Sequence, residues 1–464
     1  MDLQIQVRVL APEPKQWEHR STRHLLPCDC MSVVEHTAPA ADSGFTSLGI
    51  APSVLAVLDR LRFTVPTPIQ ARAIPLALAG KDLIGIAQTG TGKTLAFAVP
   101  ILQHVARKKQ RGLVLLPTRE LATQVDEMVR AVGASFGLRT ALMIGGASMH
   151  GQVTALQRVP HVLIGTPGRI IDHLQQGTLN LKNIGILVLD EADRMLDMGF
   201  APQLAKILQH VPRERQTLLF SATMPPSIVQ IAARHMRMPV RVEVAPSGTV
   251  AARVHQDLFI VRKEDKNRLL EKLLAESPGT MLVFVRTKHG AKRVCRLLRD
   301  HGHAVAEIHS NLSLPQRRKS LAGFKTGTYR VLVATDIAAR GLDVQNIAVV
   351  INYDMPQDPH DYVHRIGRTA RAGREGQAIT FVTPDQRGKI GGIERLVRSS
   401  LRIAPLPELP PERGAPVRLH PVADRRPGAA RKHYPAPSRG GPRGRGRRGT
   451  FHSRRVLPWR ARRR

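Results

Sequence analysis

The chain has 464 residues, of which 70 are Lys or Arg and 36 are Asp or Glu, so its formal net charge is +34. Hydrophobic residues make up 42% of the sequence and only three residues are cysteines, which excludes a small disulfide scaffold and a chain without a core. No apolar run approaches the roughly 18 residues that a membrane span requires. The positive charge favours a negatively charged partner, either nucleic acid or an anionic membrane surface.

Residues 1–42 are rich in Pro, His and Ala without periodicity, and we expect an irregular extension. From residue 43 to 244, short apolar runs alternate with amphipathic stretches, a pattern typical of βαβ units around a parallel sheet. The expected strands are Leu83–Ala87, Gly112–Leu116, Thr140–Ile144, His161–Gly165, Ile186–Leu189 and Thr217–Phe220. The clearest helical windows between them are Thr94–Val105, Glu120–Gly133 and Ala201–His210.

Residues 245–253 are small and aperiodic, and they are expected to form a linker. The alternation then resumes over 254–403 and predicts a second α/β domain with a parallel sheet. Its expected strands are Val254–Val261, Thr280–Val285, Ala304–Ile308, Tyr329–Ala334, Ala348–Asn352 and Gly376–Phe381, and its helical windows include Lys266–Ala275, Gly290–Asp300 and Pro315–Lys325. Residues 404–464 form a tail rich in Arg, Gly and Pro, and such a composition predicts disorder.

The segment AQTGTGKT, residues 87–94, lies between an expected strand and an expected helix, which is the context of a phosphate-binding loop. Gly90 and Gly92 allow the backbone to approach phosphate oxygens closely. Lys93 can reach the β- and γ-phosphates, and the Thr94 hydroxyl can bind Mg²⁺. The loop begins with Ala87 where the general pattern has Gly.

About 100 residues later, the expected strand Ile186–Leu189 is followed by Asp-Glu-Ala-Asp at 190–193. Carboxylates at the carboxyl end of a parallel strand face the crevice in which ligands bind. Asp190 suits the coordination of Mg²⁺, and Glu191 suits a base that positions the attacking water. A solvated turn is the alternative for these four residues, but the preceding phosphate-binding loop disfavours it.

Together these motifs resemble those of the DEAD-box ATP-dependent RNA helicases of superfamily 2, and the resemblance covers roughly residues 43–400. It implies two tandem RecA-like domains, an α/β fold, ATP and Mg²⁺ as cofactors, RNA as partner and local unwinding of RNA duplexes. The short Arg/Gly tail resembles that of the bacterial RhlE-like branch.

The resemblance also implies which residues bind the nucleotide. Gln70 is expected to read the adenine edge, although capping the following helix is an alternative role for it. Phe45 is expected to stack on the base, and Arg62 stands where the family has Gly. The full set of implied ATP-binding residues is Phe45, Gln70, Ala87, Gln88, Thr89, Gly90, Thr91, Gly92, Lys93, Thr94, Gly341 and Asp343.

Catalysis and its coupling to RNA are implied for a second set of residues. The implied catalytic residues are Lys93, Asp190, Glu191 and two arginine fingers, Arg368 and Arg371, because a guanidinium matches phosphate oxygens and stays charged. The implied coupling residues are Asp193, Ser221, Thr223 and His364. Ala370 replaces the family's Gly before the last Arg, and a methyl group is tolerable there if φ is negative.

RNA contacts are implied for loops that follow strands in both domains, with contacts mainly to the sugar–phosphate backbone and weak sequence preference. Each tetrapeptide alone is a weak signal, and Leu314 replaces a Gln of the family pattern. The implied residues are Pro117, Thr118, Arg119, Gly145, Gly146, Thr166, Pro167, Gly168, Arg169, Arg286, Thr287, Arg317 and Thr335.

Residues 413–464 carry 17 Lys or Arg and one acidic residue, a net charge of +16, which predicts an RNA tether. A tail that only solubilises the protein is the alternative. For the whole chain, the alternatives are an RNA clamp that hydrolyses ATP poorly and a DNA-directed motor. We expect a cytoplasmic protein without a membrane partner, and proteins of ribosome assembly or RNA degradation are candidate partners.

Overall fold

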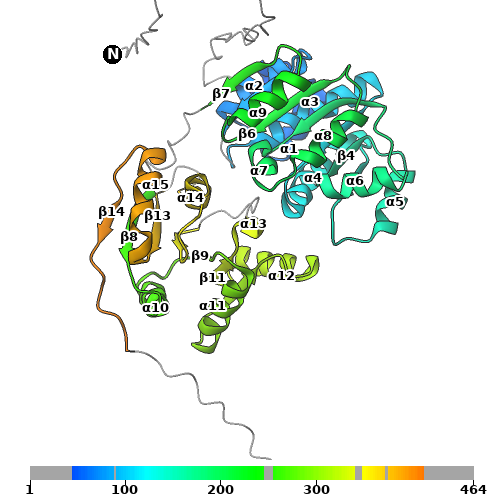
Figure 1. The fold of residues 1–464 in the computed structure, drawn as a ribbon. Helices are drawn as coiled ribbons and strands as arrows, with labels where there is room; N and C mark the ends of the chain where they lie inside the picture. Colours follow the sequence, from blue (N-terminus) through cyan, green and yellow to red (C-terminus); the bar gives the residue numbers. More distant parts are fainter. Residues whose placement is uncertain (1–43, 88–89, 245–253, 340–346, 371–374, 412–464) are drawn as a thin grey trace, which may run out of the picture. The chain divides into compact units, whose positions relative to one another are not determined.

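The computed structural model describes residues 44–87, 90–244, 254–339, 347–370 and 375–411 (Figure 1). Within them lie two seven-stranded sheets, and every strand pair in both sheets is parallel. The first sheet has the order β3-β4-β2-β5-β6-β1-β7, and the second has β10-β11-β9-β12-β13-β8-β14. The α/β class with two tandem parallel sheets, as in RecA-like domains, is therefore confirmed.

The elements of the first sheet begin with the 3₁₀ turn η1 and end with the edge strand β7. Its strands are β1 Leu83–Ile86, β2 Arg111–Leu115, β3 Thr140–Met143, β4 Val162–Gly165, β5 Ile184–Leu189, β6 Gln216–Ser221 and β7 Val240–Glu243. Its helical segments are η1 Phe45–Leu48, α1 Pro52–Arg60, α2 Pro68–Leu78, α3 Lys93–Lys108, α4 Arg119–Gly133, η2 Ala134–Phe136, α5 Met149–Gln157, α6 Pro167–Gln175, α7 Ala192–Asp197, α8 Ala201–His210 and α9 Pro226–His235.

The second sheet is built in the same alternating manner. Its strands are β8 Val254–Ile260, β9 Met281–Phe284, β10 Val305–Ile308, β11 Val331–Ala334, β12 Val349–Asn352, β13 Gly376–Val382 and β14 Arg402–Ala404. Its helical segments are α10 Lys266–Glu276, α11 Lys288–Asp300, α12 Leu314–Lys325, α13 Asp336–Ala339, α14 Pro359–Ile366, η4 Pro384–Lys389 and α15 Ile390–Val397.

Each sheet is covered by helices on both faces, because alternate residues of its buried strands point to opposite sides. In the first sheet, Val114 and Val188 pack against α2, α3 and α4, whereas Leu113 and Leu187 pack against α6, α8 and α9. In the second, Val283 lies in a core with α10 and α11, and Leu282 lies in a core with α12. The continuous apolar runs of the sequence follow from this double coverage.

Two of the four edge strands, β7 and β14, were outside the sequence-based expectation. Strand β7 is partly exposed and β14 has only three residues, so neither shows a continuous apolar run. Each pairs with the first strand of its sheet, β7 with β1 and β14 with β8. Pairing energy from the neighbouring strand, rather than burial, therefore defines these two elements.

The prediction that a disordered tail begins at residue 404 is wrong. Ala404 pairs with Phe259 in β14. Farther along, Leu409 packs against the core beneath α10, and Arg268 donates hydrogen bonds to the carbonyl oxygens of Leu409 and Pro410. Backbone pairing and these bonds hold a segment whose own sequence shows no periodicity. Residues 412–464, with most of the predicted tail, lie outside the described residues.

Candidate active site

Apart from Phe45 and Gln70, which precede β1, the sequence motifs of the first sheet follow the carboxyl ends of its strands. The phosphate-binding loop follows β1, the acidic segment follows β5, and Ser221 ends β6. Pro117, Gly145 and Thr166 come just after β2, β3 and β4. Because the strands are parallel, these motifs meet at one edge of the sheet, where α/β proteins bind their ligands.

Lys93 is the first residue of α3, and its ammonium group is buried behind the loop. The side chain is 5% exposed, and Nζ donates a hydrogen bond of 2.9 Å to the carbonyl oxygen of Ala87. Gly90 and Gly92 have φ angles of +89° and +91°, which favour glycine. A Cβ atom at Gly92 would also lie 2.5 Å from Nε2 of Gln70. The loop therefore depends on glycine for both conformation and space.

Gln70 connects the start of α2 to the phosphate-binding loop. Its Oε1 accepts a hydrogen bond from the Thr67 backbone nitrogen in a capping box, and Nε2 donates to the carbonyl oxygen of Gly92. The capping alternative is thus present in the structure, and the adenine-reading role stays a prediction. Phe45 is 5% exposed in a hydrophobic cluster with Leu48 and Leu95, so the structure shows a packing role for this ring.

Asp190 lies at the end of β5 and is 3% exposed. Its Oδ1 accepts a hydrogen bond of 3.0 Å from the backbone nitrogen of Glu191. Burial raises the pKa of this carboxyl from 3.8 to about 6, although the charge of Lys93 opposes the shift. A buried carboxyl with a raised pKa beside a buried ammonium is an arrangement typical of functional sites.

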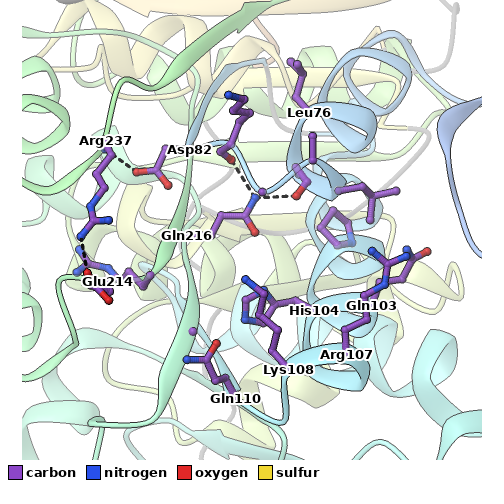
Figure 2. Close-up of a pocket in the computed structure, with 18 of the residues that line it drawn as sticks. Leu76, Asp82, Gln103, His104, Arg107, Lys108, Gln110, Glu214, Gln216 and Arg237 are labelled. Carbon is purple, nitrogen blue, oxygen red and sulfur yellow. Dashed lines mark hydrogen bonds and ion pairs between the residues drawn. The ribbon is translucent and has the colours of Figure 1, made fainter.

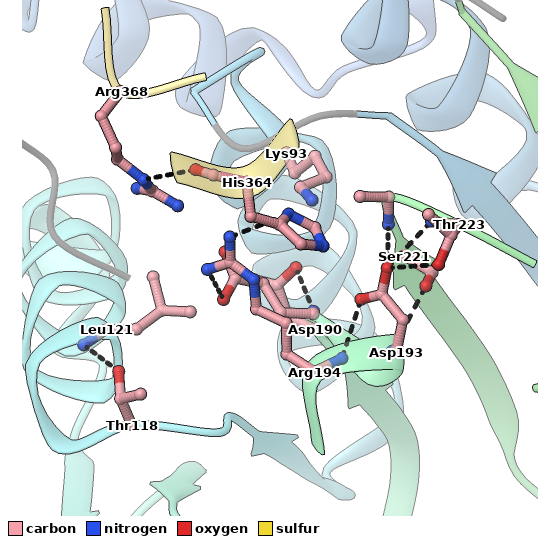
Figure 3. A network of polar contacts seen from close by, with 12 residues as sticks. Lys93, Thr118, Leu121, Asp190, Asp193, Arg194, Ser221, Thr223, His364 and Arg368 are labelled. Atoms are coloured by element: carbon pink, nitrogen blue, oxygen red, sulfur yellow. Dashed lines mark hydrogen bonds and ion pairs between the residues drawn. The ribbon is translucent and has the colours of Figure 1, made fainter. Parts of the chain in front are cut away.

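Glu191 has a left-handed backbone, with φ at +51°, at the start of α7. Its Oε2 lies 3.0 Å from Nη1 of Arg194, and both side chains are buried. The other amino group of Arg194, Nη2, lies 3.1 Å from Nδ1 of His364 (Figure 3). The backbone strain and the ion pair together fix the direction of the Glu191 carboxylate.

The four expected coupling residues divide into a cluster of three and His364. Oδ2 of Asp193 accepts hydrogen bonds from the backbone nitrogens of Ala222 and Thr223 and from Oγ1 of Thr223, at 2.9 to 3.1 Å (Figure 3). The Asp193 nitrogen donates to Oγ of Ser221. The acidic segment after β5 is therefore tied to the end of β6.

The expected RNA-contacting residues of the first sheet also gather. The guanidinium of Arg119 lies against Gly145 and Gly146, where a Cβ atom would approach it to 3.0 and 2.4 Å. Burial and neighbouring arginine charges lower the pKa of Arg119. Arg169 donates a hydrogen bond to the carbonyl oxygen of Ala147 in the same loop. Arg119 and Arg169 thus both contact the loop of residues 145–147, and two cations at one loop are suited to binding a phosphate backbone.

The remaining residues of this set shape the loops. Thr118 caps α4 by accepting a hydrogen bond from the Leu121 nitrogen (Figure 3). Thr166 is the residue before α6, and Pro167 is buried in the first turn of that helix. Gly168 has open space around it. Pro117 is buried just before Thr118. These residues set the direction of the loops that carry Arg119 and Arg169.

In the second sheet, Arg286 follows β9 with an exposed side chain, and Thr287 caps α11 through the Gly290 nitrogen. Thr335 is partly exposed after β11. Arg317 is 8% exposed, and its Nε lies 2.6 Å from Oε1 of Glu120. The guanidinium of Arg317, which was expected to contact RNA, is therefore already engaged in a buried ion pair with Glu120.

The condition under which a methyl group is tolerable at Ala370, a negative φ, is not met, because its φ angle is +53°. The side-chain methyl therefore carries the strain that the family's Gly avoids. Next to it, Arg368 is 3% exposed and its Nε donates to the carbonyl oxygen of His364. The expected residues Gln88, Thr89, Gly341, Asp343 and Arg371 lie outside the described residues.

Two buried arginines at the site were missed by the sequence reasoning. Arg194 follows the acidic segment, and its spacing of three residues from Glu191 on a helix is a detectable signal of an ion pair. Arg365 binds both carboxylate oxygens of Asp336 and also contacts Oδ1 of Asn352. No local sequence pattern predicts the contacts of Arg365, because its partners Asn352 and Asp336 come from β12 and α13.

Thr94 and Asp190 fit a Mg²⁺ ion, which prefers oxygen ligands and is usually bound through one or two carboxylates and substrate phosphates. The uncompensated burial of the Asp190 carboxyl supports this fit, since a cation would offset it. Among the described residues, no group of three or more His, Cys, Asp or Glu forms a protein-only metal cluster. In that same part of the chain, no helix combines the length and the apolar character needed to cross a bilayer.

Comparison with known proteins identifies the two halves. The family model for the DEAD/DEAH box helicase matches residues 67–231, and that for the helicase conserved C-terminal domain matches 265–373. The DEAD-box ATP-dependent RNA helicase CshA of Geobacillus kaustophilus is 47% identical over 360 residues, which cover 77% of each chain. The ATP-dependent rRNA helicase RRP3 of Debaryomyces hansenii is 46% identical over 356 residues, 76% of this chain and 75% of that one.

Solved structures agree with these relatives. S. cerevisiae Dbp5 bound to RNA and ADP BeF3 has a TM-score of 0.70 and 31% identity, covering 78% of this chain and 95% of that one. Mss116p bound to ssRNA and AMP-PNP has a TM-score of 0.73 and 26% identity, covering 81% and 82%. The RhlE-like branch stays a prediction. From its motifs, its two sheets and these relatives, the chain belongs to the DEAD-box ATP-dependent RNA helicases.

Proposed function

We propose that the residues at the carboxyl edge of the first sheet bind ATP with Mg²⁺ and hydrolyse it when RNA is bound. The single observation that carries this proposal is the buried group of Lys93, Asp190 and Glu191 at the ends of β1 and β5. Two carboxylates and an ammonium buried together are costly unless they serve a charged ligand.

Each member of this group has a separate task. Lys93 binds the β- and γ-phosphates and turns from the Ala87 carbonyl oxygen to do so. The Thr94 hydroxyl and the Asp190 carboxylate are the residues that would hold Mg²⁺, which neutralises negative charge on the phosphates. Glu191 orients the attacking water and accepts its proton, and its fixed carboxylate direction suits that role.

The second half of the chain supplies positive charge for the transition state. Arg368 and Arg371 act as arginine fingers on the phosphates, and Gly341 and Asp343 contact the nucleotide. Asp193, Ser221, Thr223 and His364 couple this site to RNA. The hydrogen bonds of Asp193 to the end of β6 support the coupling role, because a shift in either segment moves the other.

RNA binds along loops of both halves, through its backbone rather than its base edges. Arg119 and Arg169 beside Gly145 and Gly146 support this assignment in the first half. The solved complexes of Dbp5 with RNA and of Mss116p with ssRNA support RNA as the partner. The buried pair of Arg317 with Glu120 requires that Arg317 exchange partners before it contacts RNA.

We also infer two RecA-like domains over residues 43–244 and 254–403, joined by the linker 245–253, with an RNA-tethering tail after them. A cytoplasmic location fits an RNA-directed enzyme. Because one relative is named an rRNA helicase, ribosome-assembly proteins are favoured as partners over those of RNA degradation.

The test is ATP hydrolysis by the full chain, measured with no nucleic acid, with RNA and with DNA. The proposal expects strong stimulation by RNA and little by DNA, and separation of a short RNA duplex that requires ATP. Lys93→Ala should remove both activities, whereas Lys206→Ala, which changes an exposed lysine on α8, should keep them. Hydrolysis that RNA does not stimulate would indicate a clamp, and equal stimulation by DNA would indicate a DNA-directed motor.

A further inference from the structure

A pocket of about 1160 Å³ lies at the amino ends of the first sheet's strands, at the edge opposite the ATP site. It is bounded by the last turn of α2, the second half of α3 and the starts of β1, β5, β6 and β7 (Figure 2). The length of a four-residue strand, about 13 Å, separates the two edges. The pocket is therefore distinct from the phosphate-binding loop, and we call it the amino-edge pocket.

The amino-edge pocket is positively charged. Five Lys or Arg residues line it against two acidic ones, and the cations are Lys81, Arg107, Lys108, Arg215 and Arg237. Neither carboxylate offsets this excess fully. Asp82 accepts hydrogen bonds of 2.7 Å from the backbone nitrogens of Thr217 and Arg237, so backbone groups already occupy it. Glu214 is exposed and lies 3.9 Å from Arg237.

Arg215 is the partly buried cation of this pocket. Its two terminal nitrogens donate to the carbonyl oxygens of Pro212 and His235, and none of the ion pairs in the described part of the chain involves it. Its Nε is buried and has no hydrogen-bond partner among the described residues. Burial lowers the pKa of this guanidinium, and the negative charge of Asp82 offsets that shift only in part.

Gln103 offers a second buried donor. The residue is 5% exposed; Oε1 accepts from the Ala51 nitrogen, while Nε2 has no acceptor in the described residues. Three buried atoms of the lining have no hydrogen-bond partner in the described residues, namely Nε of Arg215, Nε2 of Gln103 and Nε2 of His104. The first two are donors, and a buried donor without an acceptor costs about 1–3 kcal/mol. A ligand that places acceptor oxygens here would relieve this cost.

The mouth of the pocket carries an unusual apolar residue. Met238 is 80% exposed and has a φ angle of +36°, a conformation that non-glycine residues rarely adopt. Leu76, Pro100 and Val240 add apolar lining. Methionine adapts its shape to flat apolar groups, so the mouth suits the body of a ligand whose anionic end lies on the cations.

We propose that the amino-edge pocket binds a phosphate-bearing small molecule with a flat apolar body, of about nucleotide size. The volume of about 1160 Å³ is slightly above the range of about 300–1,000 Å³ that is common for ligand sites, so a molecule of this size has room there. Arg107 and Lys108, on the wall opposite Asp82 and Arg237 in Figure 2, bind the phosphates. Met238 covers the apolar body.

The experiment is calorimetric titration of the full chain carrying Lys93→Ala, which weakens the ATP site. The probes are inorganic pyrophosphate and guanosine 5′-diphosphate. We expect each to bind, and we expect Arg107→Ser with Lys108→Ser to weaken both by about tenfold, as for the loss of one charge-assisted contact. The matched control, Arg158→Ser with Lys206→Ser, removes the same charge from exposed positions elsewhere in the first half. It should change affinity less than twofold, roughly the scatter expected for exposed charges.

Met238→Gly tests the apolar part, and folding should not suffer, because glycine accepts the local φ angle. This substitution should weaken the binding of guanosine 5′-diphosphate and leave the binding of pyrophosphate unchanged. The proposal is overturned if neither probe binds, if the control pair weakens the probes as much as the pocket pair, or if Met238→Gly affects neither probe. It is also overturned if the pocket pair weakens only a short RNA oligonucleotide, since the surface would then bind RNA.

Discussion

Nη1 of Arg194 lies 3.0 Å from Oε2 of Glu191, and the two side chains are 2% and 4% exposed. Such a pair holds a carboxylate in one direction, and breaking it by removal of one partner leaves a buried charge. The pair therefore links the stability of the first half of the chain to the residue proposed to orient the attacking water.

Substitutions in this pair distinguish the catalytic role of Glu191 from its contribution to stability. We expect Glu191→Gln to lower the kcat of ATP hydrolysis by about 10²-fold or more, because an amide cannot accept the proton of water. It should also destabilise the fold by about 3 kcal/mol, because Arg194 loses its counter-charge.

The double variant Glu191→Gln with Arg194→Met should recover most of the stability but none of the turnover. Urea unfolding and RNA-stimulated ATPase assays measure the two quantities. Recovery of turnover in the double variant would contradict the catalytic role of Glu191.

Asp190 predicts a pH-dependent difference in stability. Its pKa rises from 3.8 to about 6 on folding, so the folded protein holds this proton more tightly than the unfolded chain. Its stabilising contribution is present below pH 4 and is lost as the pH rises through 6.

Without nucleotide, Asp190→Asn should therefore match the unchanged protein in stability at pH 4 and exceed it by about 2–3 kcal/mol at pH 7. Urea unfolding at the two pH values measures this. A stability difference that is the same at both pH values would show that the carboxyl is not perturbed. The variant should have lost ATP turnover at either pH.

Gln70 joins a helix cap to the nucleotide loop, and two substitutions separate these roles. Glu at this position keeps the acceptor of the capping box but cannot donate to the Gly92 carbonyl oxygen. We expect Gln70→Glu to keep the capping box and to lose the preference for ATP over GTP. Gln70→Ala should lose that preference and also about 1 kcal/mol of stability. Competition between ATP and GTP, with thermal unfolding, measures both; an intact ATP preference in Gln70→Glu would oppose adenine reading.

Ala370 carries backbone strain beside Arg368. We expect Ala370→Gly to stabilise the protein by about 0.5–1 kcal/mol, because glycine adopts a φ of +53° without a Cβ clash. Ala205→Gly, at an exposed position inside α8, is the matched control and should destabilise by about 1 kcal/mol. Chemical denaturation compares them, and equal losses would mean that Ala370 is unstrained. ATP turnover of Ala370→Gly should not fall.

The tail can be removed at a position that the structure defines. Because Arg268 binds the carbonyl oxygens of Leu409 and Pro410, truncation should follow Pro411 rather than residue 403. We expect a higher KM for RNA, a nearly unchanged kcat and a shallower salt dependence, since each cation bound to single-stranded RNA contributes a slope of about −0.7. A truncated protein with the same KM and the same slope would leave the tail with a solubilising role only.

The sequence predicted the strands of both sheets whose two faces are covered, because continuous apolar runs such as that of β5 follow directly from burial. The exposed edge strands β7 and β14 were not predicted, because hydrogen bonding to a neighbouring strand defines them. In the site, local motifs identified Lys93 and Asp190. The partners of Arg365 come from distant segments, and the φ angle of Ala370 depends on its surroundings; no short pattern records either.

The two sheets share one strand order when the second is counted from its own first strand. In each, the last strand pairs with the first, as β7 does with β1 and β14 with β8. The last strand of each sheet therefore ends beside the first strand, at the carboxyl edge, about one strand length from the point where the first strand begins. The same pairing favours cooperative folding of each sheet, because its first strand has neighbours on both sides only when the last strand has been made.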